Sequence, residues 1–328
     1  MLGQLKVAPG TNLGFLKMKK QIRLFTTVMV CMAMALCVSC KKDDDTSDSG
    51  GGNGGGGNTG GGGGSQTVEM RISKMSINDV NYREESTDGG QTWNVIKEWN
   101  RSETYFFTWY NNLLSKLEMR FPTEASIYDF RYDNDKLSNA IWTSPENGRI
   151  DTVACYDVEY DGDDMSEVIY HDREKPGHYY DVVYHFEYSN GKLSSVTSVK
   201  NKSVRNYFWN GDNLSEIRCP YDGAVVSFLT YDDKNNPFYG IDAFLPISLD
   251  HGVYMDNWKC RFACLGLSKN NCTKCDDLIE GRYPYTETDD FTYNGKNYPT
   301  QAVVNTIWYH SDVERTRTVE TITYEYLD

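Results

Sequence analysis

The chain has 328 residues, of which 33 are Lys or Arg and 47 are Asp or Glu, so its formal net charge is −14 at pH 7. This acidic balance argues against nucleic acid or an anionic lipid surface as a partner, because both require positive patches on the protein. The aromatic content is high, at 13% with 24 Tyr. It suits strands that cover apolar surface while keeping hydroxyl groups in water.

Residues 1–39 predict a secretory signal peptide. They contain five basic residues and no Asp or Glu, and residues 24–38 are almost wholly apolar. A positive start before an apolar run of about 15 residues is typical of such signals, and the run is too short for a stable membrane span. Met18, which opens the sequence MKK, is an alternative start. Without the five basic signal residues, 28 Lys and Arg face 47 Asp and Glu, a net charge of −19.

The signal ends at Val38, Ser39 and Cys40. A small residue before Cys, after an apolar run, resembles the lipobox of bacterial lipoproteins, although Cys37 stands where Leu is usual. The resemblance implies that Cys40 is the lipidated first residue of the mature chain and anchors it to a membrane. The sequence KKDDD, residues 41–45, resembles the export signal of Bacteroidetes surface lipoproteins. That resemblance implies an outer-membrane anchor with exposure at the cell surface.

Residues 40–65 predict a tether behind the lipid anchor. The segment 49–65 holds 12 of the 28 glycines. Such a sequence buries too little apolar surface to offset the entropy of ordering, so we expect a disordered coil. A Gly-rich coil of about 25 residues has an r.m.s. reach of roughly 25–30 Å.

Residues 66–328 contain a repeated motif, clearest in FEYSNGKLSSV at residues 186–196. It consists of an apolar residue, any residue, an anchor Tyr or Trp, four turn-like residues, Leu or Met, two polar residues, and Ile or Val. The anchors are 21 to 28 residues apart, and a weaker copy follows at Tyr293. They are Trp109, Tyr132, Tyr160, Tyr188, Trp209 and the weaker Tyr231.

Each copy of the motif predicts a β-hairpin. The apolar residue two before the anchor indicates a period of two, and pairs such as Asn190-Gly191 supply the positive φ that tight turns require. We therefore predict a mostly β fold, an antiparallel meander of repeated hairpins forming a long twisted or partly closed sheet. Residues 242–290 interrupt the series and predict a Cys-containing insertion.

The motif copies are similar to degenerate YD repeats of Rhs-type surface proteins. The sequence from Tyr231 onward, with YDDKNNPF and LSKNN, resembles a domain family of unknown function found in Bacteroidetes lipoproteins. These resemblances cover most of residues 100–310. They imply an all-β fold and an envelope location, and they carry no catalytic residues over to this chain.

Four cysteines form the most specific cluster of reactive side chains. They follow the spacing C-x3-C-x7-C-x2-C, at Cys260, Cys264, Cys272 and Cys275. Even-numbered cysteines of an exported protein usually form disulfides, and an insertion with little core of its own benefits most from cross-links. Free thiols and a four-thiolate zinc site are the alternatives. Cys155 and Cys219 stand alone on strand-like segments, as buried thiols do.

The remaining clusters favour structural roles. Acidic turns such as 161–164 match hairpin chemistry better than any calcium loop. His171, His178 and His185 are seven residues apart, and we expect strand parity to place neighbours on opposite faces, which argues against a shared metal. No catalytic motif of a hydrolase, nucleotide-binding protein or metalloprotease is present. We therefore expect neither an enzyme nor a cofactor.

Three tryptophans lie off the motif and are candidates for ligand stacking: Trp93, Trp99 and Trp142. Together these features predict a non-catalytic binding or adhesion lipoprotein for a glycan or protein ligand. The alternatives are an accessory subunit of an envelope complex and, less favoured, a hydrolase with two carboxylates about 5–10 Å apart.

Overall fold

A computed structural model of the chain describes residues 70–146, 149–173, 180–219, 225–249, 266–279 and 285–327. The predicted signal peptide and tether lie outside the described residues, as do Cys40, Cys260, Cys264 and His178. No helix among the described residues is long and apolar enough to cross a membrane.

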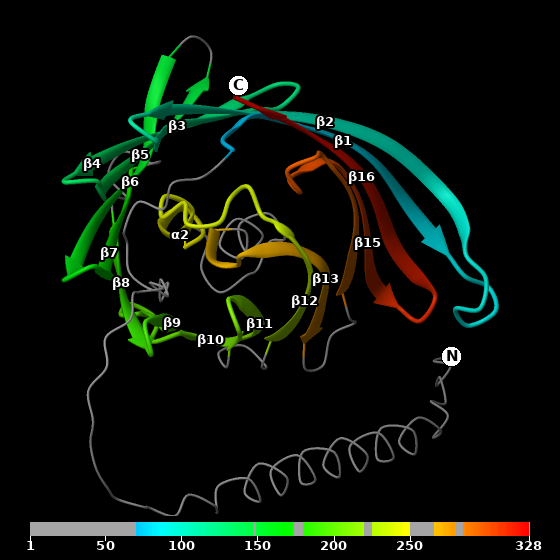
Figure 1. Cartoon of the computed structure of the whole chain (residues 1–328). Coiled ribbons are helices and arrows are strands. Elements are labelled where there is room, and N and C mark those ends of the chain that lie inside the picture. Colours follow the sequence, from blue (N-terminus) through cyan, green and yellow to red (C-terminus); the bar gives the residue numbers. More distant parts are fainter. Residues whose placement is uncertain are drawn as a thin grey trace, which may run out of the picture. The chain divides into compact units, whose positions relative to one another are not determined.

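The described chain is almost entirely antiparallel β structure with one short helix (Figure 1). The first eight strands are β1 (Ile72–Glu85), β2 (Asn94–Tyr110), β3 (Leu113–Arg120), β4 (Ala125–Asp133), β5 (Lys136–Glu146), β6 (Arg149–Asp161), β7 (Asp164–Asp172) and β8 (Tyr180–Ser189). The others are β9 (Lys192–Ser198), β10 (Val204–Asn210), β11 (Asn213–Cys219), β12 (Val225–Asn235), β13 (Asn270–Ile279), β14 (Tyr285–Tyr293), β15 (Pro299–Ser311) and β16 (Glu314–Tyr326). The helix α2 (Phe244–Ile247) lies between β12 and β13.

Each strand pairs with its neighbours in sequence, which confirms the predicted meander. The sheet closes into a barrel because β1 pairs with β2 on one side and with β16 on the other, from Ile72↔Tyr326 to Glu85↔Glu314. The prediction of an open twisted or only partly closed sheet is therefore wrong. Hairpin motifs report contacts between adjacent strands, whereas closure joins two strands at opposite ends of the domain, neither of which carries a clear copy of the motif.

The apolar core of the barrel interior is built from the repeated motif, and buried acids such as Asp79, Glu103 and Glu320 share the inward face with it. In the five clear copies, the residue two before the anchor and the Leu, Met, Ile or Val after the turn are buried, and the anchors pack against this core. In the copy at 186–196, Phe186, Leu193 and Val196 are each at most 7% exposed. The packing roles predicted from the motif are thus confirmed.

The hairpin turns also follow the prediction. Asn190 and Gly191 both have positive φ, as a two-residue type I′ turn requires. Gly162 and Gly211 have positive φ at the first central position, the pattern of type II′ turns. Adjacent turns are joined by lysines, because Lys136 donates to the carbonyl of Gly162 and lies 2.9 Å from Asp163.

A β-bulge lies at every anchor, where the strand register shifts by one residue. A bulge disrupts the ladder and leaves a backbone group to be satisfied. The Ser that follows the motif Leu supplies the missing partner: its hydroxyl donates to the carbonyl before the anchor, for example Ser115 to Thr108 at 3.0 Å and Ser194 to Glu187 at 2.9 Å. This role of the Ser was not predicted from the sequence.

The anchors link successive hairpins through their polar tips. Trp109 Nε1 donates to the carbonyl of Ile72 at 2.7 Å, and the Tyr132 hydroxyl donates to Leu114 at 2.9 Å. Trp209 Nε1 donates to Leu193, also at 2.7 Å. A long ring that ends in a donor explains why these positions carry Tyr or Trp and not Phe.

An internal segment, residues 236–249, lies inside the barrel and includes α2 (Figure 1). Phe238 is 1% exposed, and its ring centroid lies 6.0 Å from that of Phe107 on β2 and 6.4 Å from that of Tyr324 on β16. The Tyr184 hydroxyl on β8 donates to the carbonyl of Leu249 at 3.1 Å. The segment therefore contacts several sides of the wall. Of the predicted insertion 242–290, residues 242–249 belong to this segment, whereas β13 and β14 are strands of the wall.

The anchor bonds make a first testable prediction. Tyr132→Phe removes the donor to Leu114 and leaves a half-buried carbonyl without it, so we expect the free energy of unfolding to fall by about 1–2 kcal/mol. Urea unfolding measures this loss. Tyr110→Phe is the matched control, because Tyr110 is 71% exposed, and it should unfold like the natural chain. Equal stability of the two variants would contradict the role of the anchor.

Candidate binding surface

The outward face of the wall is polar along strands whose inward face is apolar. On β3, Lys116 and Glu118 point outward and lie 3.7 Å apart, while Leu117 between them is fully buried. On β13, Lys274 and Asp276 form an outward ion pair at 2.5 Å. Charged residues thus alternate with the core residues of the strands.

Outward apolar side chains are present but are interrupted by acids. Ile141 on β5 stands opposite Asp129 on β4, and Ile169 on β7 stands opposite Asp157 on β6. A wall that faces lipid needs a continuous apolar band about 25 Å tall. The outward face has the alternation of a sheet whose outer side meets water.

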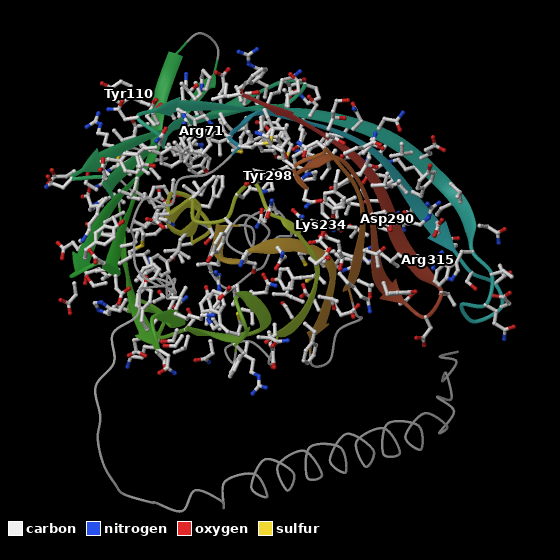
Figure 2. All side chains as sticks on the ribbon, in the orientation of Figure 1. Arg71, Tyr110, Lys234, Asp290, Tyr298 and Arg315 are labelled. Atoms are coloured by element: carbon white, nitrogen blue, oxygen red, sulfur yellow. The ribbon has the colours of Figure 1, made fainter. Side chains whose placement is uncertain are left out.

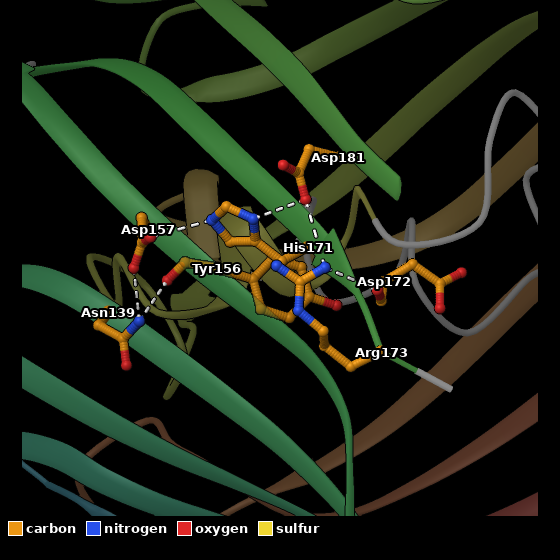
Figure 3. Close-up of polar contacts among 7 residues, drawn as sticks. All are labelled: Asn139, Tyr156, Asp157, His171, Asp172, Arg173 and Asp181. Atoms are coloured by element: carbon orange, nitrogen blue, oxygen red, sulfur yellow. Dashed lines mark hydrogen bonds and ion pairs between the residues drawn. The ribbon is translucent and has the colours of Figure 1, made fainter. Parts of the chain in front are cut away.

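A polar network crosses four strands of this face (Figure 3). His171 lies between two carboxylates, with Nδ1 2.8 Å from Asp181 Oδ1 and Nε2 3.0 Å from Asp157 Oδ2. Asn139 donates to the other oxygen of Asp157 at 2.7 Å, and Arg173 lies 3.4 Å from Asp181. The hydrogen bond from His171, followed by its charge and by Arg173, lowers the pKa of Asp181.

This network joins strands rather than forming a binding site. It connects β5, β6, β7 and β8 through groups that are already engaged with one another. His185 is on the same face, 3.2 Å from Glu167, because it has the same strand parity as Asp181. The predicted opposite faces concern the neighbours His171 and His178, and His178 and His185, and this prediction stays untested because His178 lies outside the described residues.

The three candidate tryptophans lie in different environments. Trp93 is half-buried, with the Arg315 guanidinium 4.2 Å from its ring centroid and the Tyr309 ring in edge contact at 6.0 Å. Arg315 is near the turn between β15 and β16 (Figure 2) and pairs at 2.6 Å with Glu84, which is 3% exposed. The ring of Trp93 is thus already engaged by its own chain.

Trp142 belongs to the interior, whereas Trp99 is exposed. Trp142 packs against the core and stacks on Tyr128, with ring centroids 5.7 Å apart. Trp99 on β2 is 40% exposed and stands opposite Asn81 of β1, on the face opposite that of Glu84 and Trp93. The structure therefore does not bring the three rings together, and ligand stacking stays a prediction for which Trp99 is the best placed.

Two of the four clustered cysteines are described, both on β13. Cys272 Sγ lies 3.3 Å from the carbonyl oxygen of Lys274, and Cys275 Sγ lies 3.6 Å from Oδ1 of Asp277. Cys219 is buried, which raises the pKa of its thiol. The predicted disulfides, and the thiol and zinc alternatives, stay open because Cys260 and Cys264 lie outside the described residues.

A pocket opens between β9 and β10, where the ladder has only three residue pairs. Its lining contains an arginine, hydroxyl groups, a thiol and apolar side chains, namely Tyr184, Val196, Ser198, Asn201, Ser203, Val204, Arg205, Cys219 and Leu249. None of these described lining residues is a carboxylate, so they do not supply the pair of acids that glycoside hydrolysis uses.

The strand β2 contains the longest run of exposed residues among the described strands. Its residues 94–102 are all exposed, and they include Val95 and Ile96, each 50% exposed, as well as Trp99. Nothing in the repeated motif pointed to this segment. One signal was available, since Pro122 ends the partner strand β3 after eight residues, whereas β2 has 17.

Comparison with known proteins gives a limited result. No family model and no curated protein matches the sequence, so the lipoprotein and YD-repeat resemblances stay predictions. Among solved structures, the chain is similar to a porin-like protein from Bacteroides uniformis, with 16% identity over 78% of this chain and 98% of that one, and a TM-score of 0.46. At that level the likeness carries no conclusion about the function of this chain.

The interior segment makes a pH prediction. Burial beside Tyr132, Tyr160 and Tyr188 raises the pKa of Asp242 to about 6. Because the folded state holds this proton more tightly than the unfolded state, the stability contributed is present below about pH 4 and is lost as the pH rises through 6. Asp242→Asn should therefore stabilise the protein at pH 7.5 by about 2–3 kcal/mol and have little effect at pH 4.

Urea unfolding of both proteins across pH 4–8 measures this difference. Asp135→Asn, in the exposed turn between β4 and β5, is the control and should show no such pH-dependent gain. A constant difference between Asp242→Asn and the natural chain over the whole pH range would contradict the assignment.

Proposed function

We propose that this chain is a lipid-anchored protein of the cell envelope whose barrel stands in water and acts as a non-catalytic binding module. The observation that carries the proposal is the polarity of the barrel: its interior holds an apolar core that includes a segment of its own chain, and its outward face alternates ion pairs with isolated apolar residues. A charged side chain at the middle of a bilayer costs about 2–4 kcal/mol for Lys or Arg. Many such residues on one wall favour water on that side.

Because segment 236–249 lies inside the barrel, we place the proposed ligand-binding site on the outside. Segment 236–249 takes up part of the space inside the barrel, where Phe238 and Phe244 are each at most 1% exposed. A binding function therefore favours outward surfaces and strand edges. The exposed part of β2 favours a protein ligand over a glycan, since only one of the candidate tryptophans is exposed there.

The membrane association is proposed to depend on Cys40 alone. Cys40→Ala should move the protein from the membrane fraction to the soluble fraction of the envelope, because the described strands of the barrel wall form no continuous apolar band. Fractionation with immunoblotting measures this shift. Cys31→Ala, in the predicted signal peptide but outside the lipobox, is the matched control and should stay with the membrane. Retention of the Cys40→Ala protein in membranes at high salt would contradict both the anchor and the water-facing barrel.

The binding function is tested by screening the soluble Cys40→Ala protein against protein and glycan arrays. We expect a saturable protein ligand. A fixed stoichiometric partner after cross-linking of intact cells would instead favour an accessory subunit of an envelope complex. Absence of any ligand, together with release of sugars from a polysaccharide, would replace the proposal with a hydrolase.

A further inference from the structure

The strand β2 has a free edge. It pairs with β1 from Asn94 to Phe106, but its pairing with β3 begins only at Thr104. Within the described chain, residues 94–103 thus have a ladder partner on one side only. Backbone N–H and C=O groups along such an edge are open to pairing with another chain.

This edge is long and regular enough to act as a template. The register with β1 shifts once, at Ile96, and then runs without a break from Lys97 to Glu103. Seven regular residues match the length of a typical strand. Native proteins usually shorten or cover such edges, so an uncovered edge of this length indicates a site where another chain pairs with the strand. The long β1 and β2 strands are visible in Figure 1.

One face of the edge is positively charged around an aromatic ring. Lys97, Trp99 and Arg101 share a parity and a face, and Lys97 Nζ lies 5.2 Å from the Trp99 ring centroid. Arg101 lies 5.3 Å from the Phe121 ring centroid and pairs with Glu103 at 2.6 Å. Two cations on an exposed edge stand out in a mature chain that carries a net charge of −19.

A second copy of this chain fits the edge poorly. In an antiparallel pair of identical strands, residues of like parity stand opposite each other. If the twofold axis of such a pair passes through a charged residue of the edge, that residue faces the same charge on the second copy. If the axis passes through Trp99, Lys97 of each copy faces Arg101 of the other, which again opposes like charges. If the axis passes through Asn100, the second strand extends to a position opposite Thr104, which already pairs with β3.

We propose that residues 94–103 of β2 bind an extended acidic segment of a partner protein, which adds to the barrel as an extra strand. Main-chain hydrogen bonds supply affinity in this mode, and alternate side chains supply specificity. The segment that fits has an acid, an apolar residue and an acid at positions i, i+2 and i+4, opposite Lys97, Trp99 and Arg101. The inference rests on the proposed binding function and names its site and ligand class.

The test uses the soluble Cys40→Ala protein and a labelled, capped seven-residue peptide of Thr, with Glu at the second and sixth positions and Leu at the fourth. Fluorescence anisotropy should show saturable binding that weakens as salt is raised. Lys97→Glu should weaken it about tenfold, since one attraction becomes a repulsion. Lys269→Glu, with the same charge change at a side chain that is 57% exposed near Asp212, should leave binding unchanged.

Two further peptides separate strand addition from simple charge attraction. A peptide with Lys in place of Glu, and one with alternate backbone nitrogens methylated, should both fail to bind. Equal binding of either peptide, or equal loss with Lys97→Glu and Lys269→Glu, would overturn the inference. A protein that captures an array ligand but not the acidic peptide would overturn this inference alone and leave the binding function standing. A concentration-dependent dimer abolished by Lys97→Glu would replace the peptide with a second copy.

Discussion

The barrel depends on one constraint, which is that the apolar faces of its strands must be covered. A single sheet can cover them only by closing on itself around an internal segment of the chain. Sixteen strands enclose segment 236–249, whose Phe238, Phe244 and Leu249 are almost fully buried. Burial of one such side chain contributes about 1.5–3 kcal/mol. The motif repeats this contribution from hairpin to hairpin, and the anchor bonds hold successive hairpins at a common offset.

Covering the inner face in this way determines what the outer face can do. With the apolar core on the inside, the outward side chains meet the surroundings, and they are rich in paired charges such as Lys116 with Glu118. Most of the polar side chains on this wall connect neighbouring strands of the barrel, as the network around His171 does. The exposed edge of β2 differs because its backbone groups on the side away from β1 have no ladder partner within the described chain, so it combines unused hydrogen-bonding capacity with a local positive charge.

Local features of this fold were predictable from the sequence, and long-range features were not. Turns such as Asn190-Gly191 and the burial of Phe186 and Leu193 follow from residue types a few positions apart. The closure of β1 on β16 depends on strands at opposite ends of the domain. Within the candidate surface, the sequence singled out Trp99 but grouped it with Trp142, which packs inside, because membership of the motif does not report whether other parts of the chain cover a residue.

The central claim is that the outer wall of the barrel meets water and not lipid. Spin labels on cysteines introduced at outward positions of separate strands, such as Glu118, Ile141 and Glu216, would test it in envelope membranes that carry the full-length protein. If the outer wall meets water, a water-soluble nickel complex should collide with the label at every such position more effectively than oxygen, which concentrates in lipid. A continuous belt of positions where oxygen collides more effectively than nickel would contradict it.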